Sequence, residues 1–455
     1  MSSDPGSSRP RRGARGVLGR IVVDTRPLKI PAFRRLWVST AVTAVGSQLT
    51  AVAVPKQIFD LTGSSGYVGL TGAVALVPLL VFGLWGGAIA DAVDRRKLLL
   101  VTNIGVAVSS ALLWLQAFAN FHSVTLVLVL LAANQAFFAI NMPTRGAVVA
   151  RLVPPELLPS ANALNTTMST FGAVFGPLFG GALIPVIGLS TLYLVDVCAL
   201  MITLIAVWRL PSIPPLNGPS RRAGIGDVVD GFRYLATQKV LLASFVVDII
   251  AMVAGMPRAL IPEMAERTFG DPPGGGPALG FLYAALPAGA MVIGLFSGWL
   301  HRVSRQGVAV VVSISLWGAA IAAFGLAHSL WLAVIFMALA GAADMVSSVY
   351  RQAILQTATT DEMRGRLQGV FTVVVAGGPR LADLTHGWAG AVWGTAAAAT
   401  GGGVLVIVLV FAAMLPLAAF WRYRAPLGKS DAGESDHAGA ESQVAAKGAE
   451  PVAGE

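Results

Sequence analysis

The chain has 455 residues, of which 55% are hydrophobic and only 12% are charged, whereas a typical soluble domain has about 25% charged residues. This composition excludes an ordinary soluble enzyme and a mostly disordered chain, because charge is too sparse and apolar surface too abundant. The net charge of +9 does not indicate nucleic-acid binding, since the basic residues form short clusters between apolar runs.

Apolar segments long enough for membrane helices of about 20 residues follow one another along the chain. Residues 1–32 are polar and basic, and we expect no signal peptide there, because no apolar core with a small-residue cleavage site is present. The pattern predicts an all-α membrane protein with twelve transmembrane helices. The predicted spans are residues 35–60, 67–92, 97–119, 123–144, 160–187, 189–209, 240–266, 278–300, 307–327, 330–350, 367–391 and 395–421.

Basic residues indicate how the chain is oriented, because cytoplasmic loops are enriched in Lys and Arg. Clusters such as Arg95–Lys97 and Arg302/Arg305 follow every second span, and Arg351 falls in the same series. The intervening loops hold almost none, with Arg267 as the main exception. We therefore expect a multi-pass protein of the cytoplasmic (inner) membrane with both termini in the cytoplasm.

The chain also repeats itself. The interval from Arg145 to Glu156 equals the interval from Arg351 to Glu362. Parallel repeats of this kind are a common transporter design, in which the two halves rock about a central cavity, and they predict two pseudo-symmetric six-helix halves. The predicted regions are a cytoplasmic basic tail (1–32), an N-terminal half (33–209), a cytoplasmic linker (210–239), a C-terminal half (240–422) and a disordered cytoplasmic tail (423–455).

Several kinds of chemistry have no residues to support them. The one cysteine, Cys198, and five scattered histidines form no pattern of metal ligands, and no phosphate-binding G-x-x-x-x-G-K-[ST] loop occurs. We expect no enzyme, metal or cofactor, and a transporter that uses the proton gradient. Its expected partners are a small-molecule substrate, the lipid bilayer and protons, and we expect a monomer.

The loop after the second span carries Gly87, Asp91, Arg95 and Arg96. Glycine permits close helix packing, and an aspartate at the cytoplasmic mouth can pair with an arginine or cap a helix of the other half. Such a contact can form in one transport state and break in the other, which would make these residues a gating motif. A simple cluster of cytoplasmic positive charge is the alternative.

Span 5 reads Gly172-Ala-Val-Phe-Gly176-Pro177-Leu-Phe-Gly180-Gly181. Glycines four residues apart give a smooth helix face for tight packing, and the proline bends the helix. The loop motif resembles the loop 2–3 motif of the major facilitator superfamily, with Asp94 in place of its usual glycine. The span 5 element resembles one associated with exporters of that superfamily.

Three further segments resemble the enterobactin exporter family: Ala51–Ile58, Gly280–Ala290 and Leu355–Arg366. The resemblance runs from about Pro31 to Arg424 and implies alternating access, with a siderophore leaving the cell. A macrolide or multidrug efflux antiporter is the second reading. A nutrient uptake symporter and a membrane scaffold that transports nothing are further alternatives.

Charges inside membrane spans are expensive and therefore informative. Asp248 and Asp344 are candidate proton-coupling residues, because burial disfavours the charged form of a carboxylate; a structural ion pair is the alternative. Lys56, Arg258 and Arg380 are candidates for binding an anionic substrate. Lys56 and Arg258 can instead reach towards the interface, Arg380 can pair with Asp383 three residues on, and Asp196 is expected to be structural, near the outer interface.

Overall fold

A computed structural model describes residues 24–214, 225–415 and 417–423, and all regular secondary structure in these residues is helical. Residues 1–23 and 424–455 of the two predicted tails lie outside the described residues, and the rest of the predicted N-terminal tail holds η1 and the start of α2. The first group of helices consists of η1 (Arg26–Lys29), α2 (Pro31–Thr62), α3 (Ser65–Ala92), α4 (Arg95–Phe118), α5 (Val124–Leu152), η2 (Pro155–Leu157) and α6 (Leu158–Trp208).

Helix α6 is two membrane spans joined by a reversal at Gly188, which has φ 76° and ψ 161°, a region open to glycine but not to residues with a Cβ. Before Gly188 the chain runs parallel to α2, and after it the chain runs antiparallel to α2. The contacts that establish the two directions are Gly172 at Ala44, Gly176 at Gln48 and Gly180 at Leu49 before the reversal, and Tyr193 at Gln57, Asp196 at Gly46 and Thr203 at Ser39 after it.

The second group begins with α7, a helix within the segment predicted to be a linker. Its elements are α7 (Ile225–Thr237), α8 (Lys239–Gly255), η3 (Arg258–Leu260), α9 (Ile261–Glu263), η4 (Met264–Thr268), α10 (Pro277–Leu295), η5 (Ser297–Arg302), α11 (Gln306–Gly325), α12 (Leu330–Thr357), α13 (Asp361–Trp393), α14 (Thr395–Met414) and α15 (Ala418–Trp421). The predicted span 7 is thus interrupted after α8.

Ten helical segments of the described chain are long and apolar enough to cross a membrane. One of them, Pro155–Trp208, has 54 residues and contains the reversal, so it supplies two spans. Helix α13 has 33 residues and is not among the ten, since polar residues such as Arg380 and Asp383 reduce its hydropathy. Counted in this way, the helices fit the predicted set of twelve spans.

Span ends differ most where an arginine was taken as the first loop residue. Helix α5 continues through Arg145 to Leu152, and α12 continues through Arg351 to Thr357. The last span is shorter than predicted, because α14 stops at Met414, two residues before Pro416 in the sequence, and a proline has no N–H group with which to continue the helical hydrogen bonds.

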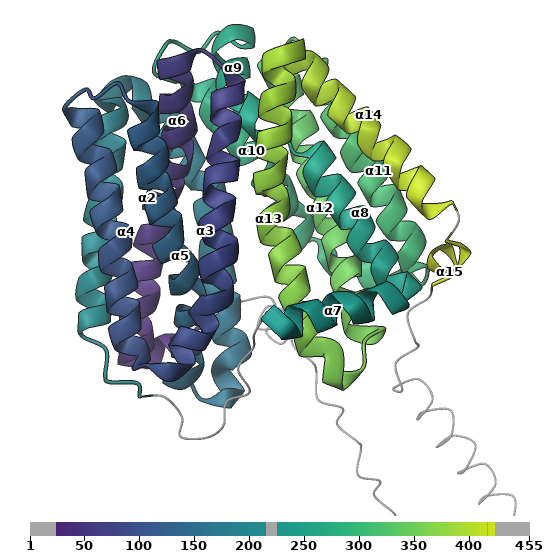
Figure 1. The fold of residues 1–455 in the computed structure, drawn as a ribbon, viewed down its shortest axis with the longest axis horizontal. Helices are drawn as coiled ribbons and strands as arrows, with labels where there is room; N and C mark the ends of the chain where they lie inside the picture. The colour runs from purple at the N-terminus through teal and green to yellow at the C-terminus, as the bar shows by residue number, and fades with distance from the viewer. Residues whose placement is uncertain (1–23, 215–224, 416, 424–455) are drawn as a thin grey trace, which may run out of the picture.

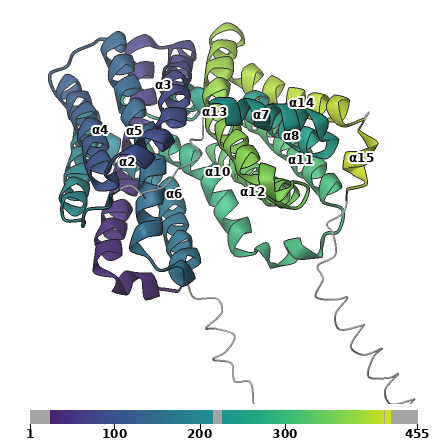
Figure 2. The same ribbon diagram turned by 60° about the horizontal axis from the view of Figure 1, so that its bottom comes forward.

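Helices α2–α6 and α8–α14 form two bundles that lie side by side (Figure 1), and the turned view keeps them apart (Figure 2). We call the end of the molecule that carries α7 and the loop at Val93–Asp94 the linker face. The opposite end, which carries α9 and the loop at Gly63–Ser64, is the far face. Figure 1 places α7 at the bottom and α9 at the top.

The two bundles touch most closely near the far face, through helices α3 and α13 and helices α6 and α10. A Cβ atom on Gly69 would lie 2.6 Å from the Asp383 carbonyl oxygen, and one on Gly280 would lie 2.7 Å from the Pro177 carbonyl oxygen. Small residues let helix backbones approach in this way. Nearer the linker face, a Cβ atom on Gly83 of α3 or Gly369 of α13 would meet no atom of the described residues within 4 Å.

Candidate functional site

A polar cavity of about 310 Å³ lies between the two bundles. Its walls come from α2, α3, α4, α5 and α6 on one side and from η3 and α13 on the other. A second cavity of about 200 Å³ shares Gln48, Ala51 and Arg258 with the first and extends to Tyr283 of α10; together we call them the central cavity. Its charged residues are Asp196, Arg258, Arg380 and Asp383.

Arg258 reaches both parts of the cavity because the helix is broken beside it. Helix α8 ends at Gly255, and Met256 and Pro257 leave the helical conformation before η3 begins. Proline lacks an N–H group and restricts the residue before it. Non-helical backbone at membrane depth is tolerated where it lines a cavity, so the interruption is consistent with a binding site at this level.

Arg380 and Asp383 lie on one stretch of α13 that borders both bundles. Arg380 Nη2 donates a hydrogen bond to Gln135 Oε1 of α5 at 3.1 Å. Among the described residues, no ion pair within 4.0 Å joins Asp383 to Arg380 or Arg258. The i,i+3 pair that the sequence makes available is therefore not formed, and the two guanidinium groups have no carboxylate partner at contact distance.

Asp196 lies on the opposite wall and is only 3% exposed. Its Oδ2 accepts hydrogen bonds from Thr50 Oγ1 at 2.8 Å and Ser110 Oγ at 3.2 Å. Its Oδ1 is buried without a hydrogen-bond partner. The sequence predicted a structural residue near the outer interface, whereas the structure places this carboxylate on the cavity wall.

Asp248, Arg351 and Asp344 form a buried triad within the second bundle. Arg351 Nη1 contacts Asp248 Oδ1, with both side chains at most 2% exposed, and Arg351 Nη2 lies 3.6 Å from Asp344 Oδ1. The structure thus brings together the two predicted proton-coupling carboxylates, around an arginine that the sequence analysis assigned to a loop. None of the three lines the central cavity.

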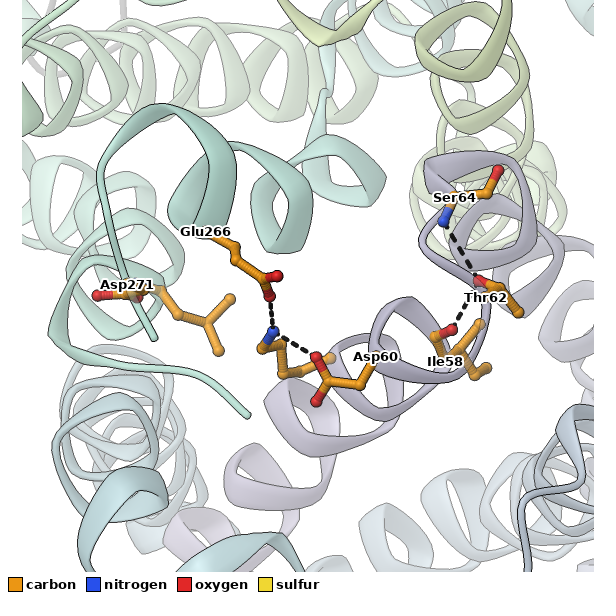
Figure 3. A network of polar contacts seen from close by, with 8 residues as sticks. Ile58, Asp60, Thr62, Ser64, Glu266 and Asp271 are labelled. Atoms are coloured by element: carbon orange, nitrogen blue, oxygen red, sulfur yellow. Dashed lines mark hydrogen bonds and ion pairs between the residues drawn. The ribbon is translucent and has the colours of Figure 1, made fainter. Parts of the chain in front are cut away.

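Lys56 is also outside the cavity, in what we call the far-face cluster with Asp60 and Glu266. Its Nζ lies 2.5 Å from Asp60 Oδ1 on the same helix and also contacts Glu266 Oε2 of η4, in the other bundle. Figure 3 shows the two labelled carboxylates converging on one nitrogen. Its side chain is 1% exposed, and it lines neither part of the central cavity.

The linker-face loop is held within the first bundle. Asp94 caps α4 by accepting a hydrogen bond from Arg96 N at 2.8 Å, and it binds Ser212 Oγ at 2.5 Å beyond the end of α6. Burial raises the pKa of Asp94, but these hydrogen bonds outweigh burial and hold that pKa below its ordinary value.

The two arginines of the predicted gating motif join the same contacts. Arg96 Nη2 donates to the Trp208 carbonyl oxygen, and the backbone N–H of Arg95 donates to the carbonyl of Ile213 at 3.0 Å. The side chains of the other two motif residues, Gly87 and Asp91, lie outside the described part of the structure.

The glycine element of span 5 faces α2. A Cβ atom on Gly172 would lie 2.8 Å from the Ala44 carbonyl oxygen, and one on Gly176 would collide with Gln48 Cβ, whereas Gly180 has ordinary van der Waals space. Pro177 lines the central cavity and touches α10 through its carbonyl. The element therefore positions two helices around the cavity.

Several neutral polar residues of the cavity were not predicted from the sequence. They are Gln48, Thr50, Ser110, Asn134 and Gln135. Amides and hydroxyls inside an apolar span are a detectable pattern, but only the fold shows that they share one wall. No group of three or more His, Cys, Asp or Glu residues that could hold a metal occurs in the described ranges.

Comparison with known proteins gives the same type of molecule. A family model described as transmembrane secretion effector matches residues 24–450. The enterobactin exporter EntS of Shigella boydii serotype 18 is 32% identical over 405 residues, which cover 87% of this chain and 94% of that protein.

Solved structures agree on the fold. The nucleoside transporter NupG has a TM-score of 0.68 at 13% identity and covers 86% of this chain and 99% of its own. A bacterial homologue of the lysosomal transporter Spinster, in an inward-facing and unoccupied conformation, has a TM-score of 0.64 at 14% identity over 88% and 97% of the two chains. The predicted all-α membrane fold and the prediction of a transporter, not an enzyme, are confirmed. The chain belongs to the transmembrane secretion effector family of the major facilitator superfamily.

Proposed function

We propose that this transporter exports a siderophore of the enterobactin type from the cytoplasm, by alternating access driven by the proton gradient. The observation that carries the proposal is the pair of arginines on the central cavity, Arg258 and Arg380, neither within ion-pair distance of Asp383 among the described residues. The names of the relatives, as enterobactin exporters, support the same cargo.

The chemistry of the two arginines suits a catecholate. A guanidinium remains protonated in proteins and presents its N–H groups in a rigid fork that matches paired oxygen atoms. The two adjacent oxygens of a catechol ring are such a pair. Tyr283 also lines the cavity, where an aromatic ring can stack against a ring of the cargo.

The contacts between the bundles are consistent with loading from the linker face. The bundles are packed together at the far face, whereas Gly83 and Gly369, nearer the linker face, have no close neighbour among the described residues. The basic loops lie at the linker face, which favours a cytoplasmic position for it. In this orientation both termini are cytoplasmic, and the described conformation is the one that receives cargo from inside the cell.

The buried triad supports a role for protons. Two carboxylates share one guanidinium, so the fully ionised triad would hold one unbalanced negative charge in the membrane, which is costly. A proton on one carboxylate removes that charge. Asp248 is the closer partner of Arg351, so Asp344 is the better candidate to bind and release the proton.

Inverted membrane vesicles provide the test. We expect vesicles with this protein to accumulate iron-free enterobactin when their interior is acidified, and to lose accumulation when the proton gradient is collapsed. Arg380→Lys should reduce accumulation several-fold because lysine lacks the fork, whereas Arg233→Lys, on exposed α7, is the matched control and should not. Accumulation of a macrolide but not of enterobactin would contradict the proposal and favour multidrug efflux.

A second variant separates anion binding from charge balance. The double change Arg380→Gln with Asp383→Asn removes both charges of this stretch of α13. If Arg380 only neutralises Asp383, the double variant should transport enterobactin normally. We expect it to remain as defective as Arg380→Gln alone, with protein amounts in the membrane unchanged.

A further inference from the structure

We propose that Gln135 is a positioning residue that holds the guanidinium group of Arg380 in place for an anionic oxygen of the cargo, and that the site selects anions because Gln135 is uncharged. The inference rests on the proposed export of a catechol compound and names a residue that sets its selectivity. It begins from one contact in the central cavity, the hydrogen bond that Arg380 Nη2 donates to Gln135 Oε1 at 3.1 Å.

This contact joins the two bundles inside the cavity. Gln135 belongs to α5 and Arg380 to α13, and both residues line the larger part of the central cavity. Both side chains are half-buried, so they remain accessible to a molecule in the cavity. Cargo bound at this contact would therefore touch groups of both bundles at once.

The hydrogen bond fixes which way the amide group of Gln135 points. A guanidinium carries only donors, whereas an amide has an acceptor oxygen and a donor nitrogen. Oε1 must therefore face Arg380, because Nε2 in its place would set donor against donor. Among the described residues, the bond to Arg380 is the one side-chain hydrogen bond of Gln135. Its Nε2 is thus available to a molecule in the cavity.

The same bond leaves most of the guanidinium group available for binding. An arginine side chain has five N–H donors in a planar fork, and the bond to Gln135 uses one of them. In the described chain, the Arg380 side chain makes no other hydrogen bond and no ion pair within 4.0 Å. Because one end of the fork is held in advance, an anion binds with a smaller loss of side-chain entropy. The groups that remain are all donors, which suits the paired oxygens of a catecholate and does not suit a cation.

The neutrality of Gln135 matters as much as its position. A carboxylate in the same place would form a charge-assisted pair with Arg380 and would cancel the charge that attracts an anion. Asp383 lines the same cavity, but it forms no ion pair with Arg380 within 4.0 Å in the described residues. Glutamine therefore orients the arginine without neutralising it, and Gln135→Glu should shift the preference of the cavity from anions towards cations.

The test measures binding to the purified full-length protein in lipid nanodiscs, with empty nanodiscs as the blank. The two probes are iron-free enterobactin and the lipophilic cation tetraphenylphosphonium. We expect Gln135→Leu to bind enterobactin about tenfold more weakly than the wild type and to leave binding of the cation unchanged. Gln135→Glu should bind enterobactin more weakly still and the cation more tightly than the wild type. Gln352→Leu, which removes an amide of α12 outside the cavity, is the matched control and should bind both probes as the wild type does.

A double variant shows whether Gln135 acts through Arg380. In an Arg380→Gln background, Gln135→Leu should weaken enterobactin binding little further, because the group that Gln135 positions is gone. Fluorescence size-exclusion chromatography establishes that each variant is folded. If Gln135→Glu does not fold, Gln135→Leu and the double variant decide the outcome.

The failures of the two proposals can be told apart. If both Gln135 variants bind both probes as the wild type does, while Arg380→Gln loses enterobactin, this inference is wrong and export of the siderophore stands. If Gln135→Leu weakens enterobactin binding equally with and without Arg380, Gln135 does not act by positioning the arginine, and the inference is again wrong. If the wild type does not bind enterobactin at all, the proposed function fails, and this inference fails with it.

Discussion

Replacing Glu266 with glutamine is expected to loosen the contact between the two bundles at the far face. Lys56 has two carboxylate partners, and only one of them is in the other bundle. The pair with Asp60 lies within α2 and survives any movement of the bundles, whereas the pair with Glu266 exists only while the bundles touch. The second pair therefore favours the far-face-closed conformation, and the first does not.

The exposures of the partners set the size of the effect. The side chain of Lys56 is 1% exposed and that of Glu266 is 27% exposed, so this ion pair is intermediate between exposed pairs and fully buried pairs. Exposed ion pairs contribute about 0.2–1 kcal/mol, and removing one partner of a fully buried pair costs about 3–5 kcal/mol. We expect about 1–2 kcal/mol, which changes the ratio of open to closed molecules by roughly 5–30-fold.

Spin-label distances measure this ratio. His122 and His328 are exposed, lie in far-face loops of different bundles, and can be replaced by cysteine in a Cys198→Ser background. Glu266→Gln should move the distribution towards longer distances, and Asp60→Asn, the matched control, should move it much less. Equal shifts in the two variants, or no shift with Glu266→Gln, would refute the idea that the pair between bundles holds this face closed.

Three other changes test separate parts of the molecule. Asp344→Asn should abolish proton-driven accumulation in inverted vesicles but allow downhill exchange. Asp248→Asn should also lower the melting temperature, because it leaves the buried Arg351 without its closest partner. Full uphill transport by both variants would contradict proton coupling at the triad. Gly176→Val should reduce the amount of folded protein in the membrane, measured by fluorescence size-exclusion chromatography, because its Cβ would collide with α2. Asp94→Ala should destabilise the protein by about 1 kcal/mol through the lost helix cap. The pKa of Asp94 is lowered in the folded protein, so this stabilisation is present at neutral pH and is lost only as pH falls through that lowered pKa. Thermal unfolding of the wild type and the variant at several pH values measures it.

Most spans could be predicted from the sequence because each of these consists of one long apolar run, and a membrane requires the backbone groups in such a run to be satisfied within a helix. The wrongly predicted span ends came from charged residues that were taken as loop residues. Arg351 marked a loop in the prediction because loop positions are basic. In the structure it is 3% exposed, and Asp248, which lies 103 residues earlier in the chain, compensates it. A pairing over that separation cannot be read from local composition.

The cavity was harder to predict than the spans, for a related reason. Arg258 and Arg380 were recognised as unusual because an arginine in an apolar run stands out on its own. Asp196 was expected to be structural, and only the fold shows that it lines the cavity and accepts hydrogen bonds from Thr50 and Ser110 of two other helices. Lys56 shows the reverse case: its charge is as unusual as that of the arginines, but the fold places two carboxylates beside it.

The repeated arginines give the two bundles related but unequal parts. Arg145 of α5 donates to the Thr40 hydroxyl of α2, and Arg351 of α12 contacts Asp248 of α8, so each arginine reaches the first helix of its own bundle. Of the two arginines, only Arg351 contacts a carboxylate on that helix. In the first bundle the buried carboxylate is Asp196 instead, on the cavity wall and away from any cation at contact distance in the described chain. A proton at the triad can therefore act on cargo in the central cavity only through movement of the second bundle. Loss of proton coupling with normal binding of cargo is the outcome expected from changes at the triad.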